Sequence, residues 1–126
     1  MCLDVRNGGT ASGTPVQLYW CNGSPSQMWA PMPASSVGTL INPASGLCLD
    51  VSGASTASGT VLQLYTCNGS NAQKWTLPPF SGGKVTLTSG LGGNICVSST
   101  TAAMDQAKTQ NPCSGSQFTY TPNPAS

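Results

Sequence analysis

Histidine and glutamate are absent from the sequence, and charge of either sign is scarce, with four Lys and Arg residues and three Asp residues in 126. Without His or Glu, nucleophilic and general acid–base catalysis lack their usual residues. The four cations are scattered, whereas a protein that holds phosphates clusters them. The formal net charge is only +1. We therefore expect neither an enzyme active site nor a nucleic-acid partner.

Long apolar runs are also lacking. No segment has the 3.6-residue apolar periodicity of a helix or the length of a transmembrane span, so membrane insertion is not expected. Short runs at 16–19 and 61–65 instead alternate as strands do, and polar turn residues separate them. An abundance of Gly, Ser, Asn and Pro can indicate disorder, but disorder also requires few apolar residues and a high net charge. The pattern predicts one all-β domain of many short strands.

Six cysteines fall into three pairs along the chain, which are Cys2 with Cys21, Cys48 with Cys67, and Cys96 with Cys113. Six cysteines allow 15 pairings, and free buried thiols are an alternative, but the recurring spacing favours one bridge inside each pair. Such bridges indicate an oxidising compartment, so we expect a secreted protein whose export signal lies elsewhere, since none follows Met1. No two cysteines have the close spacing of zinc ligands and His is absent, so no metal or other cofactor is expected.

Three copies of one unit of about 40 residues account for this spacing. The first two copies share Cys-Leu-Asp-Val, Gln-Leu-Tyr, Cys-Asn-Gly-Ser and Gln-x-Trp, and each matched position in the second lies 46 residues after its counterpart. The third copy is eroded, with Cys-Val-Ser at 96–98. A few short strands cannot bury an apolar face alone, but three units around a pseudo-threefold axis can share one core. We expect Trp29, Trp75 and Phe118 in that core.

The repeats are placed at about 1–37, 38–83 and 84–117 of a single domain, 1–126. The second and third repeats have lead-in strands at 38–46 and 84–89, whereas the first opens on its cysteine. The C-terminal Asn-Pro-Ala-Ser echoes the same four residues in the second lead-in strand. We expect 118–126 to fold back beside Cys2 and supply the missing strand. A chain trimmed through its first strand is the alternative.

The motifs Cys-Leu-Asp-Val, Gln-Leu-Tyr before a second cysteine, and Gln-x-Trp resemble the ricin B-type lectin family, which includes the family 13 carbohydrate-binding modules. The likeness covers nearly the whole chain. It implies an all-β β-trefoil of three pseudo-symmetric four-stranded repeats with up to three shallow sugar pockets. It also implies a secreted, non-catalytic module that binds galactose- or xylose-containing glycans, often appended to a glycoside hydrolase. Carbohydrate is then the expected partner, and a protein-binding β-trefoil (an inhibitor or scaffold) is the alternative.

Asp4 and Asp50 are the principal sugar ligands that the resemblance implies. A carboxylate can accept hydrogen bonds from two adjacent hydroxyls, and charge-assisted hydrogen bonds are the stronger kind. The alternative is that each Asp merely initiates the turn that follows it. Because the two Asp occupy equivalent places in separate repeats, we expect them to lie farther apart than the roughly 5 to 9.5 Å that glycoside hydrolysis requires.

Tyr19 and Tyr65 occupy the family's stacking position, where a flat ring packs on the apolar face of a pyranose. Strand alternation puts each Tyr on the same face as a Gln and turns Leu18 and Leu64 toward the core. The alternative is that each Tyr is ordinary strand surface, and Trp20 is left unassigned between core and surface. The remaining residues expected at the two sites are Gln17, Asn22, Gln27, Gln63, Asn68 and Gln73.

Gln27 and Gln73 belong to Gln-x-Trp, and they either touch the sugar or brace the Asp. We expect their Trp partners in the core rather than facing the sugar. The resembled family has Asn before this Gln, whereas this chain has Ser26 and Ala72, with Asn71 as a substitute in the second repeat.

The third repeat departs further from the family pattern. Ser98 stands where Asp is expected, and Thr109 and Asn111 are taken to replace the Gln and the Tyr, so we expect no working pocket there. Asn-Gly-Ser at 22–24 and 68–70 also matches the glycosylation acceptor pattern. A glycan there would crowd the expected pockets, and both matches are taken as incidental.

Overall fold

The computed structural model describes residues 2–32, 37–76, 88–91, 95–97, 105–111, 113 and 121–122. Within these residues the protein is all-β, with short 3-10 turns and no α-helix. The strands are β1 (Cys2–Val5), β2 (Val16–Tyr19), β3 (Met28–Met32), β4 (Val37–Asn42), β5 (Leu47–Val51), β6 (Leu62–Tyr65), β7 (Trp75–Thr76), β8 (Thr88–Ser89), β9 (Cys96–Val97), β10 (Asp105–Gln106), β11 (Thr109–Gln110) and β12 (Thr121–Pro122). The 3-10 turns are η1 (Arg6–Gly8), η2 (Pro25–Gln27), η3 (Ser52–Ala54) and η4 (Asn71–Gln73).

The first two repeats use the same antiparallel strand pair in the same register. In β1 and β2, Asp4 lies opposite Gln17, and in β5 and β6, Asp50 lies opposite Gln63. Matching turns lie at equivalent places, with η1 and η3 between the two strands of each pair and η2 and η4 after it. The identical register explains why one sequence pattern yields two copies of the same local arrangement.

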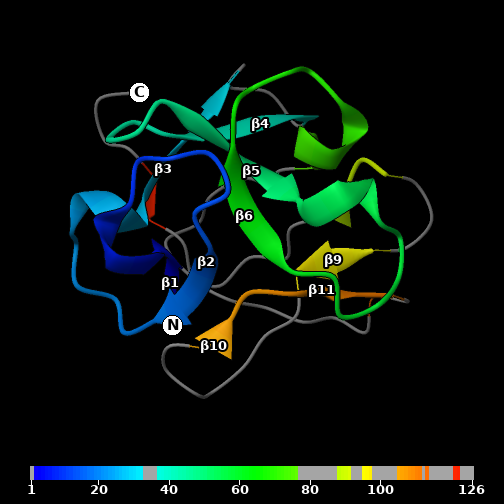
Figure 1. Cartoon of the computed structure of the whole chain (residues 1–126), viewed down its shortest axis with the longest axis horizontal. Helices are drawn as coiled ribbons and strands as arrows, with labels where there is room; N and C mark the ends of the chain where they lie inside the picture. Colours follow the sequence, from blue (N-terminus) through cyan, green and yellow to red (C-terminus); the bar gives the residue numbers. More distant parts are fainter. Residues whose placement is uncertain are drawn as a thin grey trace.

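Neighbouring repeats are joined by backbone hydrogen bonds around the pseudo-threefold axis. The Ala107 N–H donates to Val16 O at 2.9 Å, and the Leu62 N–H donates to Ala107 O at 2.8 Å. The Leu64 N–H in turn donates to Thr14 O at 2.8 Å. Figure 1 shows the result, with β1 and β2 on one side of the central β6 and β9 and β11 on the other. This mutual pairing covers strand edges that a single repeat would expose.

The core is formed by the inward face of these strands. Trp29 and Trp75 are fully buried, and their indole N–H groups donate to Leu3 O at 3.2 Å and to Leu49 O at 3.1 Å. The predicted core position of both Trp residues is therefore confirmed, and neither faces solvent. Phe118, the third residue expected in the core, lies outside the described residues.

Strand alternation is also confirmed at Leu18 and Leu64, which are buried while the residues on either side of them turn toward the opposite face. Together with Leu49 and Leu62 these side chains belong to one continuous apolar cluster. The cluster draws on all three repeats, since it includes Val97.

Three disulfide bonds each close one repeat. Cys2–Cys21, Cys48–Cys67 and Cys96–Cys113 have Cα–Cα distances of 5.1, 5.2 and 5.3 Å. The structure thus contains the pairing that the recurring spacing favours. In the chain-entropy account, which is disputed, each bridge of this loop length stabilises the fold by about 3 kcal/mol.

The register of the third repeat corrects the sequence alignment by one residue. Cys96 lies opposite Gln110, as Cys48 lies opposite Tyr65. Gln110 therefore takes the place of the Tyr, and Lys108 takes the place of the Gln. The assignment of Thr109 and Asn111 to these two places was wrong. It counted back from Cys113 as if the loop before that cysteine had the same length as in the other repeats, but this loop is one residue longer.

The expected fold-back of 118–126 can be followed only at Thr121 and Pro122. These two residues form β12, which pairs in parallel with Met28 and Trp29 of β3. In the second repeat, the lead-in strand β4 pairs antiparallel with the equivalent Trp75. Both strands thus pair with the strand that contains the buried Trp of the repeat, but β12 runs parallel to it and β4 runs antiparallel to it. The rest of 118–126 lies outside the described residues, so pairing beside Cys2 remains a prediction.

One turn position differs between the repeats in a way that affects stability. Gly8 and Ala54 are equivalent, and both have positive φ, at 64° and 52°. This left-handed region suits Gly but costs a residue with a Cβ about 1 kcal/mol or more. Ala54→Gly is therefore expected to raise the free energy of unfolding by about 0.5 to 1 kcal/mol, measured by urea denaturation.

The reciprocal change, Gly8→Ala, is the matched control and should lower the free energy of unfolding by a similar amount. An added Cβ there would meet only Ser26 Oγ, at 3.4 Å, so the cost comes from the backbone. Destabilisation by Ala54→Gly would contradict this account of the turn.

Candidate functional site

The first candidate site is built around Asp4, whose carboxylate is held by two glutamine amides. Gln17 Nε2 donates to Asp4 Oδ1 and Gln27 Nε2 donates to Asp4 Oδ2, both at 2.9 Å. Each Gln is fixed by a further partner, because Arg6 Nε donates to Gln17 Oε1 at 3.0 Å and the Asn22 N–H donates to Gln27 Oε1 at 2.8 Å. The orientation of the carboxylate is therefore set before any ligand arrives.

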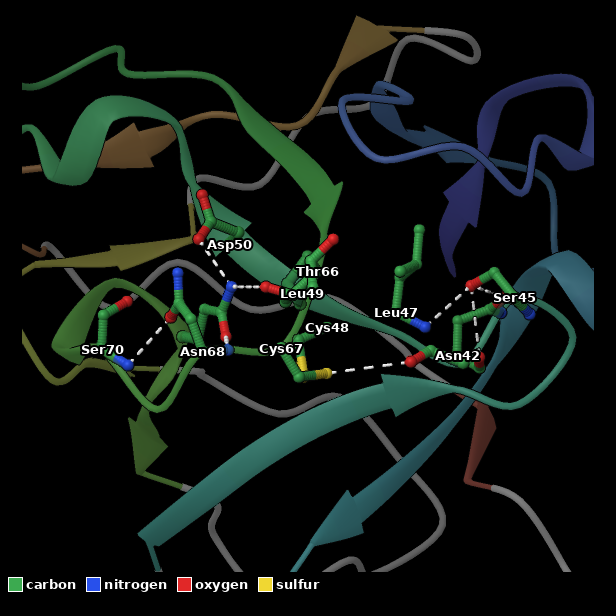
Figure 2. The surroundings of a disulfide bond; sticks show 12 residues. Asn42, Ser45, Leu47, Cys48, Leu49, Asp50, Thr66, Cys67, Asn68 and Ser70 are labelled. Atoms are coloured by element: carbon green, nitrogen blue, oxygen red, sulfur yellow. Dashed lines mark hydrogen bonds between the residues drawn. A yellow bond between two sulfur atoms is a disulfide. The ribbon is translucent and has the colours of Figure 1, made fainter.

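The second candidate site repeats this arrangement around Asp50. Gln63 Nε2 donates to Asp50 Oδ1 at 3.1 Å and Gln73 Nε2 donates to Asp50 Oδ2 at 3.0 Å. The Asn68 N–H donates to Gln73 Oε1 at 2.9 Å. Figure 2 shows Asn68 and Ser70 on the loop beside the Cys48–Cys67 disulfide, with Asp50 above them. The disulfide thus tethers the loop that supports the site.

Asp4 and Asp50 each line a separate pocket. The Asp4 pocket has a volume of about 240 Å³, and its lining residues include Gln17, Tyr19 and Asn22. The Asp50 pocket has a volume of about 380 Å³ and is lined by the equivalent Gln63, Tyr65 and Asn68. Eight of the ten residues expected at the sites are therefore gathered into two equivalent pockets.

The other two expected site residues, Gln27 and Gln73, lie behind the pockets. Both are fully buried, and both also donate to a main-chain oxygen, of Trp20 and of Thr66 respectively, at 2.9 Å. Of the two roles left open by the sequence, this geometry corresponds to bracing. The amides hold the Asp and tie it to the loop that follows each second cysteine.

The aromatic residues lie at the pocket mouths. Tyr65 is 43% exposed and Tyr19 is partly buried, and both line their pockets. Trp20, left open between core and surface, is 61% exposed. The two Tyr rings are therefore available as apolar surfaces beside a carboxylate, which is the combination that binding a pyranose requires.

Several pocket residues did not stand out in the sequence as site residues. The turn before β2 contributes Asn7 and Gly8 to the first pocket, and η3 contributes Gly53 and Ala54 to the second. Ser24 and Ser70 also line the pockets. The duplication of Asn-Gly-Ser in both repeats was a usable signal for the two Ser residues.

The residues before Gln-x-Trp also line the pockets, Ser26 in the first and Ala72 in the second. Asn71, suggested as a substitute for the family's Asn in the second repeat, is not among the residues that line the second pocket.

The third repeat uses its equivalent strand for contacts with the second repeat. Thr109 is buried, and its Oγ1 donates to Ala57 O at 3.2 Å. Asn111 Nδ2 donates to Thr56 O at 2.6 Å. The residue at the Gln position is Lys108, a cation, and the residue at the Asp position, Ser98, lies outside the described residues. The absence of a working pocket in this repeat remains a prediction.

Replacing Asp by Asn should cost more stability at the first site than at the second, because only at the first site are the amide oxygens of both Gln residues held by described donors. The NH2 group of the new Asn would face the NH2 group of a Gln, and two donors cannot form a hydrogen bond with each other. Gln17 is held by Arg6, so neither Gln around Asp4 can turn its oxygen inward. We expect Asp4→Asn to lower the free energy of unfolding by about 1 to 2 kcal/mol more than Asp50→Asn.

In the second repeat, the described residues provide no donor to Gln63 Oε1, and Ser52 stands where the first repeat has Arg6. Gln63 can therefore rotate its amide and accept from an Asn at position 50. Urea denaturation of Asp4→Asn and Asp50→Asn measures the difference between their losses in free energy of unfolding. Arg6→Ser in the Asp4→Asn background is the control and should remove most of this difference. Equal losses in the two single variants would contradict the account.

The fold and the paired pockets define a β-trefoil of the lectin type. The sequence profile of the family described as "Ricin-type beta-trefoil lectin domain-like" matches residues 1–65 and again residues 33–111. The chain belongs to this family. No curated protein matches the sequence.

Solved structures with the same fold include a designed protein and parts of two larger natural ones. ThreeFoil, a designed 3-fold symmetric protein, is similar with a TM-score of 0.83 and 26% identity, over 94% of this chain and 89% of that one. The exo-beta-1,3-galactanase 1,3Gal43A from Clostridium thermocellum is similar with a TM-score of 0.72 and 27% identity, over 94% of this chain. A mosquitocidal holotoxin shares the fold, with a TM-score of 0.74 and 20% identity.

This chain spans only 27% of the galactanase and 15% of the holotoxin. In the described residues, no helix is long and apolar enough to cross a membrane.

Proposed function

We propose that the chain is a non-catalytic carbohydrate-binding module that binds galactose- or xylose-containing glycans through the Asp4 and Asp50 pockets. The observation that carries the proposal is the twofold occurrence of a carboxylate oriented by two Gln amides in a pocket that a Tyr also lines. Each carboxylate oxygen accepts one Gln hydrogen bond and keeps a lone pair for a sugar hydroxyl. The Tyr ring then packs against the apolar face of the sugar.

Membership of a lectin-like family supports carbohydrate as the ligand class. The similarity to a galactanase supports attachment to a glycoside hydrolase and favours galactose among the candidate sugars. The three disulfides fit an extracellular location, which we propose for this chain. Its purpose would be to hold an attached enzyme near its polysaccharide.

Binding rather than bond cleavage is supported by the surroundings of the carboxylates. Asp4 and Asp50 line different pockets, and each is flanked by amides rather than by a second acid. Hydrolysis of a glycoside requires two carboxyl groups on either side of one bond. Shallow pockets with few contacts are expected to bind single sugars weakly, with Kd values of roughly millimolar to high micromolar.

Calorimetric or NMR titration with galactose, lactose, xylose and xylo-oligosaccharides tests the proposal. Saturable binding is expected in the parent chain and loss of binding in the Asp4→Asn/Asp50→Asn double variant. Because Asp4→Asn also affects stability, Tyr19→Ala/Tyr65→Ala serves as a second variant that leaves the braced carboxylates in place. Absence of binding across the panel by the folded, disulfide-bonded chain would overturn the proposal and favour a protein-binding trefoil.

A further inference from the structure

The two pockets share their carboxylate, Gln, Tyr and Asn residues but differ along one wall. In the first repeat this wall consists of Asn7, Gly8 and Ser26. In the second repeat the equivalent residues are Gly53, Ala54 and Ala72. The Asn7 side chain of the first pocket thus corresponds to the hydrogen atom of Gly53 in the second. The Ser26 hydroxymethyl group likewise corresponds to the methyl group of Ala72.

The first wall carries two polar groups, the Asn7 amide and the Ser26 hydroxyl. Among the residues that the structure describes, neither the Asn7 amide nor the Ser26 hydroxyl makes a hydrogen bond. Ser26 Oγ lies 3.4 Å from the place that a Cβ on Gly8 would take, so Gly8 leaves this hydroxyl uncovered. The first pocket therefore offers a donor and an acceptor beyond those around Asp4.

The wall of the second pocket is apolar and leaves more room. Ala54 and Ala72 present methyl groups, and Gly53 adds no side chain, in a pocket of about 380 Å³ against about 240 Å³ for the first. A hydroxyl placed against this wall would lose water without gaining a protein partner, which is unfavourable.

We propose that the two pockets select different sugars, with the Asp4 pocket preferring hexopyranoses and the Asp50 pocket accepting pentopyranoses and 6-deoxyhexopyranoses. The inference rests on the proposed function. In the Asp4 pocket, Asn7 and Ser26 bind the exocyclic hydroxyl of a hexose. In the Asp50 pocket, Ala54 and Ala72 contact the same region of a sugar that lacks this hydroxyl. One chain would then attach to polysaccharides that contain both kinds of sugar.

The test compares sugars that differ only in the hydroxymethyl group, in proteins with one working pocket. Galactose is paired with L-arabinopyranose, and glucose with xylose. The Asp50→Asn/Tyr65→Ala chain reports the first pocket, and the Asp4→Asn/Tyr19→Ala chain reports the second. In NMR titrations we expect the first pocket to bind the hexose about tenfold more tightly than its paired pentose. The second pocket should bind the pentose at least as tightly as the hexose.

Exchanging the walls then assigns the preference to these residues. Gly53→Asn/Ala72→Ser should give the second pocket the preference of the first. Position 53 has open space for a side chain, and Asn tolerates its positive φ of 64°. Asn7→Gly/Ser26→Ala should abolish the preference of the first pocket while binding of the pentose is retained.

Equal hexose-to-pentose ratios in the two pockets would overturn the inference while leaving the proposed function intact. Ratios that differ but do not follow the exchanged residues would overturn it as well. If the parent chain binds none of the four sugars, the proposed function fails and the inference fails with it. Circular dichroism and urea denaturation of each variant show that a loss of binding does not come from unfolding.

Discussion

Gln27→Leu, which replaces a polar side chain by an apolar one of broadly similar size, is expected to lower the free energy of unfolding by about 3 kcal/mol or more. Gln27 is fully buried and joins three groups, which are Asp4 Oδ2, Trp20 O and the Asn22 N–H, at distances of 2.8 to 2.9 Å. A Leu leaves all three without this partner. Each buried polar group left unsatisfied costs about 1 to 3 kcal/mol.

Urea denaturation with the disulfides intact measures this loss, and Gln73→Leu should reproduce it in the second repeat. Gln63→Leu is the matched control. Gln63 is only partly buried, and within the described residues its side chain makes one hydrogen bond, to Asp50, so its replacement should cost less than half as much. If Gln27→Leu is as stable as the parent chain, the Gln residue is not the structural brace described above.

Disabling either pocket alone is expected to weaken binding to a long polysaccharide by about 100-fold or more. Two pockets on one rigid domain can hold the same polysaccharide chain, and the second contact is then intramolecular. Tyr19→Ala and Tyr65→Ala each remove one contact without altering the Gln braces. Affinity for galactan or xylan is measured by calorimetry or affinity electrophoresis.

Monosaccharide binding is the control for this effect. The remaining pocket should keep its single-sugar Kd, because the other pocket is lined by different residues. A merely twofold loss of polysaccharide affinity in each single variant would show that the two pockets act independently.

Sequence patterns alone predicted an all-β domain built from repeated units, and the resemblance to ricin B-type lectins added the β-trefoil fold and an Asp at the centre of each candidate site. The offset of 46 residues between matched positions indicated duplicated units. Strand alternation correctly placed Gln17 with Tyr19 on one face and Leu18 in the core. The register that sets Asp4 opposite Gln17 then repeats at Asp50.

The walls of the pockets could not be predicted in the same way. Asn7 and Ser26 are far apart in sequence and meet only because η1 packs against η2. The role of Gln27 depends on burial, which Gln-x-Trp does not reveal. The alignment of the third repeat was wrong because its loops differ in length, and counting from Cys113 shifts every side chain in the strand to the opposite face.

The most direct test of the two-pocket account is an NMR titration of the ¹⁵N-labelled parent chain with galactose and with xylose. The account predicts saturable shifts of the Gln17, Gln27, Gln63 and Gln73 side-chain amides and of the Asn22 and Asn68 backbone amides. Resonances of β9 and β11 should stay in place. Saturable shifts confined to other residues, or no shifts with any sugar of the panel, would contradict the claim that Asp4 and Asp50 are the centres of two carbohydrate-binding sites.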